Sequence, residues 1–507
     1  MAITGKNLIA GQWTGETQEG FVAFNAVLNQ PMTDKFADAS EQEVETAITQ
    51  AHQAFITYSQ LTANERANFL DTIGEQIIAL GDELIATASA ETGLPVARIT
   101  GERGRTVGQL GLFANLLRSG EYQGIIEHAN PTREPLPKPD TRLGYLPVGV
   151  VAVFGASNFP LAFSTAGGDT ASALAAGCPV VMKAHTAHPA TAELVAQAIL
   201  KAIELCDLDN GVFSLIQGEN YAISSQIVTH PLVKAVGFTG SERVGMILQQ
   251  QINQRAEPIP FYGELGSVNP QFVMANKLAA DASEIAQGLV ASLMMGQGQF
   301  CTSPGIWVVV DDENYATFEQ SAIEAIQTQP AGVMLTPGIR ECYQSTVSHW
   351  QNLTGVKMLA VGQQGDAHLC TAALFSTDIA NFIENPALQE EVFGSCALIV
   401  KCTDFAQMQQ FVTLLRGNLT ASIHAVDADI EQARAIAQPL AHKVGRLIYN
   451  QMPTGVEVCA SMNHGGPFPA STNVRSTSVG SEAIKRFQRP ICYQNMPKAL
   501  LPSLLQD

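Results

Sequence analysis

The stretch Val148-Gly-Val-Val-Ala-Val-Phe154 predicts a buried strand, because every residue in it is apolar or lacks a side chain. The small residues from Ser164 to Ala176 then predict a helix, and Pro179-Val-Val-Met-Lys183 predicts a second strand. The alternation continues with expected helices at 191–205, 223–229 and 241–251 and expected strands at 212–216, 233–238 and 259–264. Such alternation is typical of a parallel sheet with helices on both faces. We therefore expect an α/β fold whose ligands bind beyond the carboxyl ends of the strands.

The flanking segments extend this pattern in both directions. Apolar residues recur at helical spacing between Ser40 and Gly120, which predicts a layer of helices. Residues 121–139 contain four closely spaced prolines and are expected to be extended and to leave the main body. Strands and helices are expected again up to about Gly445, followed by a glycine- and proline-rich stretch at 450–472 and a segment, 474–496, that could add an edge strand to another subunit.

Composition excludes several classes of protein. The 507 residues suffice for two or three domains, and 46% hydrophobic against 15% charged residues indicates a compact globular chain. The net charge of −19 would repel phosphate backbones, so nucleic acid is not an expected partner. The nine cysteines form no CxxC pair and no metal-ligand spacing, which favours reduced thiols, no metal site and a cytoplasmic location. We expect no signal peptide and no membrane span, since no run approaches about 18 apolar residues.

One cysteine lies in a glycine-rich elbow, Gly296-Gln-Gly-Gln-Phe-Cys-Thr-Ser-Pro-Gly305. Residues 281–284 before it have the form of a capping box at a helix start, and residues 306–310 after it predict a buried strand. The glycines permit backbone conformations that would let the Cys301 side chain face a cleft. Alternatively, Cys301 is one more small buried hydrophobe.

Three other residues could support chemistry at this cysteine. Glu264 follows an apolar strand and could act as a general base if burial raised its pKa, or it could be a helix cap or a surface ion pair. Asn158 could donate its amide to a developing oxyanion, or it could simply form a turn. His464, in Asn-His-Gly-Gly-Pro467, could be a base near neutral pH, although loop histidines are more often merely exposed.

The sequence also offers residues for a nucleotide cofactor. The fingerprint GxGxxG is absent from the first strand-to-helix turn, which does not support a standard Rossmann site. Gly240-Ser-Glu-Arg-Val-Gly245 opens a helix whose free N–H groups could bind a pyrophosphate, or it could be a plain helix start. Lys183 could bind ribose hydroxyls or extend to solvent, and Glu391 could be a ribose ligand or a solvated charge.

Taken together, four motifs resemble the aldehyde dehydrogenase superfamily in their order and spacing: Phe238-Thr-Gly-Ser241, Glu264-Leu-Gly266, Gly298-Gln-Phe-Cys301 and Glu391-Val-Phe-Gly394. The resemblance covers nearly the whole chain. It implies an α/β fold with two doubly wound parallel-sheet domains and a β-arm that joins subunits into a dimer or tetramer. The implied ranges are 1–120 and 148–264 for the cofactor-binding domain, 265–472 for the catalytic domain, and 121–147 and 473–507 for the oligomerisation arm.

The resemblance also implies roles for individual residues. The Cys301 thiolate would attack an aldehyde carbonyl, with the alkoxide held by the Asn158 side chain and the Cys301 backbone N–H. Glu264 would activate the water that hydrolyses the thioester, and His464 would share or take over that role. The cofactor-binding residues implied are Lys183, Thr186, Gly240, Ser241, Gly245, Glu391 and Phe393.

The resemblance includes a departure that concerns the cofactor. Many NAD-preferring relatives have a glutamate three residues after the lysine, where this chain has Thr186. A carboxylate there would repel a 2′-phosphate, whereas threonine can donate a hydrogen bond to it. We therefore expect NADP as cofactor, with NAD also possible, and Arg243 could add a phosphate contact.

The motifs Pro260–Pro270, Lys183–Pro189 and Pro453–Pro467 are similar to a narrower branch of the family, which oxidises 2,5-dioxopentanoate (α-ketoglutarate semialdehyde) or long-chain fatty aldehydes. A semialdehyde would need a cation for its distal carboxylate, for which Arg103 and Arg475 are candidates, and a fatty chain would need an apolar tunnel. Two departures from the family concern the shape of that tunnel: the tryptophan that often precedes Asn158 is absent, and Ser267 replaces a second glycine.

Two other classes of protein remain open. One is a cysteine hydrolase that uses Cys301 and His464 without a cofactor, and the other is a non-catalytic homologue.

Overall fold

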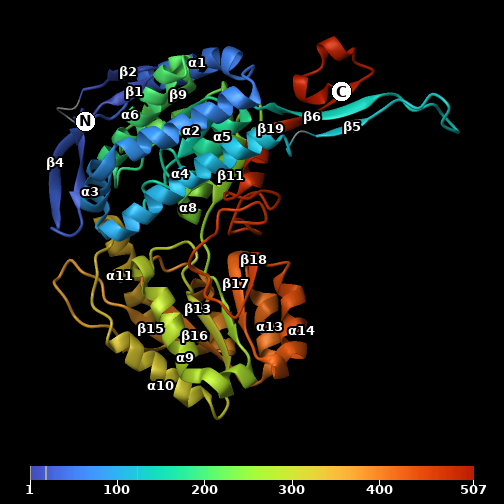
Figure 1. The fold of residues 1–507 in the computed structure, drawn as a ribbon. Helices are drawn as coiled ribbons and strands as arrows, with labels where there is room; N and C mark the ends of the chain where they lie inside the picture. The colour runs from blue at the N-terminus through green and yellow to red at the C-terminus, as the bar shows by residue number, and fades with distance from the viewer. Residues whose placement is uncertain (1, 17–19, 123, 507) are drawn as a thin grey trace.

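The computed structural model describes residues 2–16, 20–122 and 124–506. Figure 1 shows two units joined by a narrower junction, with the N-terminal half of the chain in one unit and most of residues 271–449 in the other. Each unit is built on its own seven-stranded sheet, and the structure thus has the α/β architecture that the sequence predicts.

The sheet of the first unit has the order β11-β10-β7-β8-β9-β1-β2. Its strands are β1 (Asn7–Ile9), β2 (Gln12–Thr14), β7 (Val150–Phe154), β8 (Val180–Lys183), β9 (Phe213–Ile216), β10 (Val233–Thr239) and β11 (Phe261–Glu264). Strands β7 to β11 are parallel, while β1 is antiparallel to both β9 and β2. The five parallel strands lie where the alternating pattern predicts them. Their short apolar runs are buried on both faces of the sheet, as is usual for parallel strands that helices cover on both sides.

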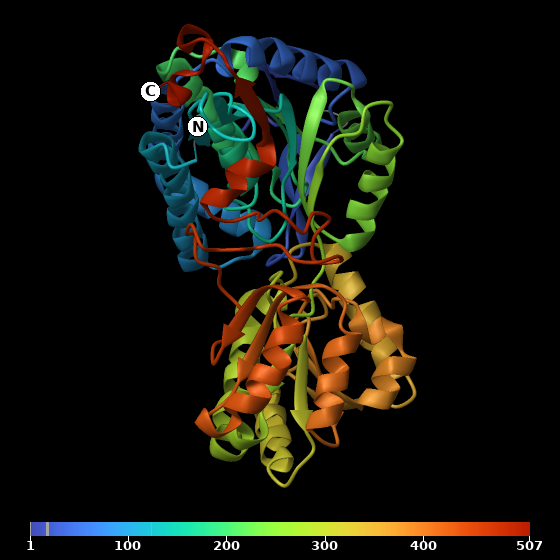
Figure 2. The same ribbon diagram turned by 90° about the vertical axis from the view of Figure 1, so that its right-hand side faces the viewer.

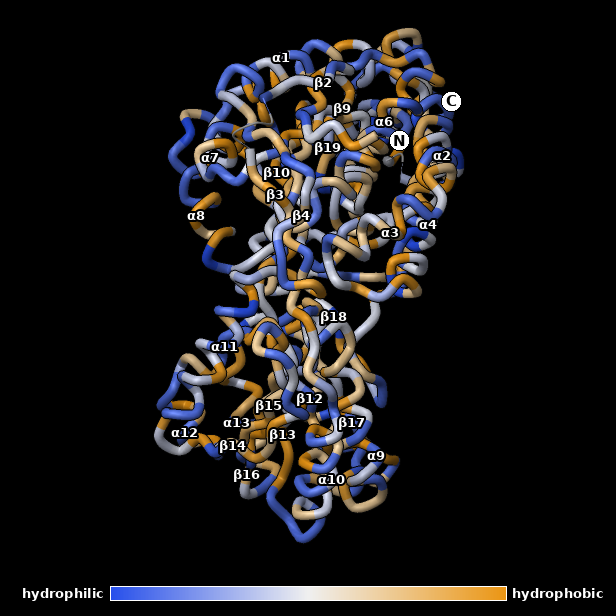
Figure 3. The backbone as a smooth tube through the Cα atoms, turned by 90° about the vertical axis from the view of Figure 1, so that its left-hand side faces the viewer, coloured by the Kyte–Doolittle hydropathy of each residue, from blue (hydrophilic) through white to orange (hydrophobic). Residues whose placement is uncertain are grey.

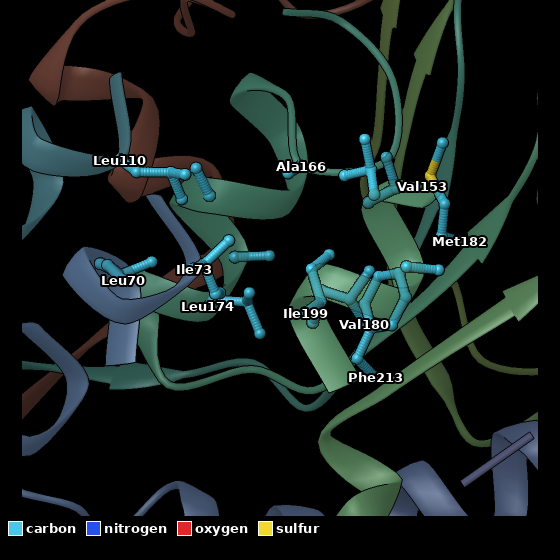
Figure 4. Close-up of a cluster of buried hydrophobic side chains, with 14 of the residues drawn as sticks. Leu70, Ile73, Leu110, Val153, Ala166, Leu174, Val180, Met182, Ile199 and Phe213 are labelled. Carbon is cyan, nitrogen blue, oxygen red and sulfur yellow. The ribbon is translucent and has the colours of Figure 1, made fainter. Parts of the chain in front are cut away.

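Helices cover both faces of this sheet. Around it lie α1 (Glu41–Tyr58), α2 (Ala63–Ala79), α3 (Gly81–Thr92), α4 (Val96–Ser119), α5 (Gly168–Ala176), α6 (Pro189–Leu205), α7 (Tyr221–Thr229) and α8 (Glu242–Asn253). Along β7, Val151 and Val153 face the cluster beneath α2, α4 and α6, whereas the alternate residues face the cluster beneath α1, α7 and α8. Figure 4 shows part of the first cluster, with Val153 and Val180 from the sheet opposite Ile199 and Leu174 from the helices.

The predicted helix at 164–176 is shorter than expected and begins at Gly168. The preceding residues form turns in which Phe163 N–H donates to Phe159 and Gly167 N–H donates to Ser164. A Cβ at Gly167 would lie 2.6 Å from the Ala162 carbonyl oxygen. The small residues that suggested a helix here therefore serve a tight loop beside Asn158, where side chains would not fit.

The second unit has the sheet order β14-β15-β16-β13-β12-β17-β18. Its elements are β12 (Gln271–Val273), α9 (Ala275–Met294), β13 (Ile306–Val310), α10 (Tyr315–Gln327), α11 (Pro337–Gln351), β14 (Lys357–Val361), β15 (Ala373–Asp378), α12 (Ile379–Glu384), β16 (Cys396–Cys402), α13 (Phe405–Leu414), β17 (Asn418–His424), α14 (Ile430–Leu440) and β18 (Val444–Tyr449). The strands are parallel apart from β14, which pairs antiparallel with β15. In Figure 3 the buried strands β13 and β15 are largely hydrophobic in colour.

The predicted capping box at 281–284 marks an interruption of a helix and not its start. Helix α9 begins at Ala275, and Asp281 inside it has non-helical angles (φ −137°, ψ 29°). The Asp281 carboxylate pairs with Lys277, four residues earlier. Because Ile285, Leu289 and Leu293 are buried beyond this point, the apolar stripe predicted there is confirmed.

A three-stranded sheet extends away from the first unit, as Figure 1 shows. It consists of β5 (Ile125–Glu127), β6 (Thr141–Pro147) and β19 (Gln488–Gln494), with β19 antiparallel to β6. The sequence assigned the segment just before β19 to the arm. In the structure this segment packs into the first unit, since Ala483, Ile484 and Phe487 belong to its core. The remaining hairpin pairs β3 (Phe21–Asn25) with β4 (Gln30–Phe36). Among the described residues, none of the helices combines the length and the apolar character needed to cross a bilayer.

Candidate active site

Four chain segments that are distant in sequence meet at the junction of the two units. Cys301 lies between α9 and β13, Glu264 ends β11, Asn158 follows β7, and His464 lies in the segment between β18 and the 3-10 helix at Ser481–Phe487. Figure 2 shows the red C-terminal segment crossing the junction between the units. Glu264 and Asn158 thus follow carboxyl ends of parallel strands, where ligands bind in α/β sheets.

The elbow before Cys301 is a left-handed turn. Gly296, Gln297 and Gly298 have φ values of 57°, 56° and 69°. A Cβ at Gly298 would lie 2.3 Å from the backbone carbonyl of Gly394, so only glycine allows the two loops to approach this closely. The predicted glycine elbow therefore fixes Cys301 next to the loop that carries Glu391.

Cys301, His464 and Glu264 form a compact cluster. Sγ of Cys301 lies 3.4 Å from Nε2 of His464, and the same nitrogen lies 2.9 Å from Oε1 of Glu264. The ligand atoms of all three side chains lie within 4.8 Å of one another. His464 and Glu264 are only 2% and 3% exposed, so their interactions with Cys301 are little screened by solvent. The loop histidine is therefore buried in the site, not exposed.

The hydroxyl of Ser478 orients both members of the acid–base pair. Its Oγ donates to Oε2 of Glu264 at 2.6 Å, and its backbone N–H donates to the carbonyl of His464 at 2.9 Å. The backbone N–H of His464 in turn donates to Oγ1 of Thr477. Oε1 of Glu264 faces Nε2 of His464, and its second lone pair can accept a hydrogen bond from a water.

The surroundings push the pKa values of this cluster in opposite directions. Burial raises the pKa of Glu264, but its electrostatic interaction with His464 and the hydrogen bonds to Glu264 outweigh it, so its pKa lies below the ordinary value. Burial raises the pKa of Cys301 well above its usual range, and the negative charges of Glu264 and Glu391 add to this effect. Cys301 is thus a thiol at neutral pH beside an ionised carboxylate, and it needs a neighbouring group to take its proton.

Asn158 contacts the elbow two residues before Cys301. One N–H of its amide donates to the carbonyl of Gln299 at 2.9 Å, which leaves the second amide N–H free for another acceptor. The backbone N–H of Cys301 makes no backbone hydrogen bond within the part of the chain that the structure describes. Both groups therefore have a donor available for an oxyanion.

Helix α4 holds the loop that carries Asn158. Oε1 of Glu102 accepts the backbone N–H groups of Leu161 and Ala162 at 2.9 and 3.0 Å. Arg98 donates to the backbone carbonyl of Asn158 at 3.1 Å. These contacts, and those of Gln299 and Ser478, were not predicted. The sequence could have indicated the helix residues, because the charged residues Arg98, Glu102 and Arg105 recur at helical spacing in a segment that otherwise forms core.

A cavity of about 600 Å³ at the junction would accommodate a nucleotide. It is lined by the start of α8, with Ser241 and Arg243, by 266–268, and by Glu391. Ser241 caps α8 by accepting the N–H of Val244, and a Cβ at Gly245 would lie 2.3 Å from Leu265. Gly240, Ser241 and Gly245 thus form a closely packed helix start whose free N–H groups suit a pyrophosphate.

The predicted ribose ligands also lie in suitable surroundings. Nζ of Lys183 donates to the carbonyls of Ala184 and Gly218 at 2.9 and 2.6 Å, and its third proton is available. Burial lowers the pKa of Lys183 to about 8 and raises that of Glu391 to about 8, the latter with help from Glu264. Hydroxyl groups would satisfy both side chains without adding charge, so these residues fit the ribose groups of NAD or NADP.

The other predicted positions have different surroundings. Thr186 is half-buried in the loop between β8 and α6, and Phe393 packs against the core of the first unit. Arg103 points away from the site, since it donates to the carbonyl of Gly81 on α3. Arg475 is exposed and lines a separate surface cavity. Neither arginine is placed to anchor a substrate at Cys301.

Comparison with known proteins agrees with this geometry. The sequence profile of the Aldehyde dehydrogenase family matches residues 13–489. The chain is 47% identical to alpha-ketoglutaric semialdehyde dehydrogenase 2 of Azospirillum brasilense, over 100% of this chain and 97% of that protein. It is 45% identical to an alpha-ketoglutaric semialdehyde dehydrogenase of Acinetobacter baylyi, over 99% of this chain and 96% of that protein.

Solved structures support the fold alone, because their sequences are more distant. An NADP-dependent enzyme of E. coli matches with a TM-score of 0.82 at 21% identity, over 97% of this chain and 98% of that one. The aldehyde dehydrogenase KauB of Pseudomonas aeruginosa matches with a TM-score of 0.83 at 20% identity, over 97% of each chain.

Proposed function

The chain belongs to the aldehyde dehydrogenase family, whose members oxidise aldehydes to carboxylic acids through a catalytic cysteine, and on that premise we propose that its substrate is α-ketoglutarate semialdehyde. The product would be 2-oxoglutarate. The observation that carries this proposal is the identity of 47% and 45%, over essentially the whole chain, with two relatives named for that activity. The buried cluster of Cys301, His464 and Glu264 supports the chemistry.

The reaction begins at Cys301. As Sγ attacks the aldehyde carbon, its proton passes toward His464, whose Nε2 lies 3.4 Å away, and the Glu264 carboxylate stabilises the resulting imidazolium. The new C–S bond converts the carbonyl oxygen into an alkoxide. The free amide N–H of Asn158 and the backbone N–H of Cys301 donate to this oxygen.

Oxidation and release then follow at the same carbon. Bound NAD or NADP would supply the oxidising group, by accepting hydride from the carbon that now carries the C–S bond. Lys183 and Glu391 would hold the two riboses, and the start of α8 would hold the pyrophosphate. Water attacks the thioester while the Glu264 carboxylate takes a proton from it, and the C–S bond breaks to return the thiolate. His464 returns the proton to Cys301.

We propose NADP as the preferred cofactor, with NAD also accepted, because Thr186 presents a hydroxyl and no negative charge near Lys183. Thr186→Glu is expected to lower the ratio of kcat/KM for NADP to that for NAD by about 10- to 100-fold, since a carboxylate repels a 2′-phosphate and accepts a 2′-hydroxyl. Initial rates with each cofactor measure this ratio. Thr186→Ser keeps the hydroxyl and should leave the ratio nearly unchanged. An unaltered ratio in Thr186→Glu would remove Thr186 from cofactor selection.

The substrate is tested with the wild-type enzyme by comparing kcat/KM for 2,5-dioxopentanoate with that for a series of linear aliphatic aldehydes. We expect 2,5-dioxopentanoate to exceed pentanal by about 100-fold, the size of effect that a buried charged contact provides. If kcat/KM instead rises with aliphatic chain length, the enzyme is a fatty aldehyde dehydrogenase. Hydrolysis of esters without any saturable NADP binding would indicate the cofactor-independent hydrolase.

We propose that the arm formed by β5, β6 and β19 joins two copies of this chain into a dimer, or into a tetramer of two dimers. The arm projects from the first unit and carries exposed apolar residues, among them Ile125 and Leu136 at 59% and 69% exposure. Apolar groups on a projecting sheet are typical of an interface between subunits.

We also propose that the two units divide the reaction between them, with the cofactor bound by the first unit and Cys301 carried by the second.

We also propose a cytoplasmic location. All nine cysteines are free, including four buried ones, Cys178, Cys370, Cys396 and Cys402, that contribute to the cores. Reduced thiols in this number are typical of a reducing compartment.

A further inference from the structure

Three arginines lie around the approach to Cys301, and their side chains differ in how many partners they have. Arg98 donates to the carbonyl of Asn158, pairs with Glu102, and lies 4.6 Å from the ring centres of both Phe159 and Phe300. Arg446 donates to the carbonyls of Gly455 and Pro453. Both terminal nitrogens of Arg446 are therefore engaged, and only its Nε lacks a partner among the described residues, while Arg98 holds the loop of Asn158.

Arg105 has no such partners. Its Nε and Nη2 atoms are buried, and neither they nor any other atom of its side chain makes a hydrogen bond or ion pair with a described residue. A buried guanidinium normally satisfies its donors, because a buried donor without a partner has lost its hydrogen bonds to water and gained none in return. Unpaired donors of this kind indicate a place where a ligand or ordered water completes the structure.

The position of Arg105 connects it to the reacting atoms. Its guanidinium carbon lies 5.5 Å from the ring centre of Phe163, and that ring lies 6.2 Å from the imidazole of His464, which contacts Cys301. One turn further along α4, the amide of Gln109 is also buried without partners. Polar groups without partners are thus aligned on the face of α4 that borders the active site.

We propose that Arg105 binds the terminal carboxylate of the substrate and so selects aldehydes that carry an acid at their far end. This inference rests on the proposed function, and it names the residue that makes that function specific. A guanidinium presents two parallel N–H groups that match a carboxylate, and the unpaired Nε and Nη2 of Arg105 are such a pair.

The electrostatics of the site agree with an anionic ligand at this point. Burial lowers the pKa of Arg105, and nearby acidic groups, Cys301 and Glu102 among them, offset this only in part. A bound carboxylate would offset the remaining cost and would keep the guanidinium fully charged. The guanidinium also lies over the ring of Phe163, and its Nε and Nη2 are buried, so an ion pair formed there would be little screened by solvent.

Steady-state kinetics of Arg105→Gln tests the proposal. The expected result is a fall of about 100-fold in kcat/KM for 2,5-dioxopentanoate and for succinic semialdehyde, mainly through KM, with less than about a threefold change for butanal. Inhibition by 2-oxoglutarate against the aldehyde should weaken by a similar factor, which reports binding without chemistry. Arg105→Lys keeps the charge and loses the paired donors, so an intermediate KM is expected.

Arg103→Gln on the same helix is the matched control, because Arg103 faces α3, and it should behave as the wild type for every aldehyde. An equal loss for butanal and for 2,5-dioxopentanoate in Arg105→Gln would mean that Arg105 supports only Cys301, and would overturn the proposal. If the wild type prefers acidic aldehydes and Arg105→Gln keeps that preference, the anchor is wrong while the proposed function stands. If the wild type shows no preference for acidic aldehydes, the proposed function fails, and the anchor fails with it.

Discussion

Cys301→Ser is expected to lower kcat for aldehyde oxidation by about 10⁴-fold, because a hydroxyl is a far weaker nucleophile than a thiolate and no covalent thioester can form. The geometry makes this loss specific to chemistry. Serine is nearly isosteric with cysteine, and the left-handed elbow at 296–298 fixes the backbone independently of the side chain. The measurement is initial-rate reduction of NADP with saturating 2,5-dioxopentanoate.

Cys206→Ser is the matched control for Cys301→Ser, since Cys206 lies at the end of α6, away from the junction, and should retain wild-type rates. Binding of NADP, followed by protein fluorescence, should be unchanged in Cys301→Ser. A Cys301→Ser enzyme that keeps more than a tenth of the wild-type rate would exclude Cys301 as the nucleophile.

Because burial and nearby carboxylates raise the pKa of Cys301, the wild-type kcat/KM should increase with pH through the neutral range as the thiol loses its proton.

Glu264→Gln is expected to lower the steady-state kcat by about 10²- to 10⁴-fold, the contribution typical of a general base. Attack by Cys301 and hydride transfer need no water, so they should be less affected than thioester hydrolysis. Rapid mixing should therefore show one equivalent of NADPH formed per site, followed by slow turnover as the thioester accumulates. Mass spectrometry of the quenched enzyme would detect the acyl group on Cys301.

The role of His464 is separated from that of Glu264 by the same experiment. His464→Gln removes the imidazole that contacts Sγ, so we expect both the burst and the steady state to slow. Since the pKa of Glu264 is lowered, the carboxylate stays ionised at neutral pH, and its protonation should reduce kcat only in distinctly acidic solution. Glu204→Gln, an exposed change on α6, is the control. A rapid burst with unimpaired turnover in Glu264→Gln would assign the deacylating base to His464.

The alternating strands and helices of the first unit follow from the local sequence. Apolar runs such as Val150–Phe154 are buried on both faces of a parallel sheet, and this burial alone determines their conformation. The predicted helix start at Ser164 and the capping box at Asp281 were wrong because tertiary contacts prevailed over local preference. At the first site the chain must turn beneath Asn158, and at the second it continues as helix across the interruption.

In the active site, too, local sequence predicted some features and tertiary contacts decided the others. The sequence identified Cys301, Glu264, Asn158 and His464 as candidates through motifs of a few residues each. It could not show that His464 contacts a cysteine 163 positions earlier, because that contact depends on the return of the chain from the second unit to the first. The sequence also offered Arg103 and Arg475 as candidate anchors for a carboxylate. In the structure Arg103 points toward α3 and Arg475 lies on the surface. The direction of a helical side chain depends on its place in the turn, which the sequence alone did not resolve.

The sequence by itself determined which residue types are available, where the strands lie, and that a cysteine occupies a glycine elbow. Only the tertiary structure decided which of these residues share one buried volume and therefore perturb one another's charge. It lowers the pKa of Glu264, raises that of Cys301, and leaves the donors of Arg105 without partners. The physical reason is that burial and Coulomb interactions depend on distance in space, which local patterns along the chain do not encode.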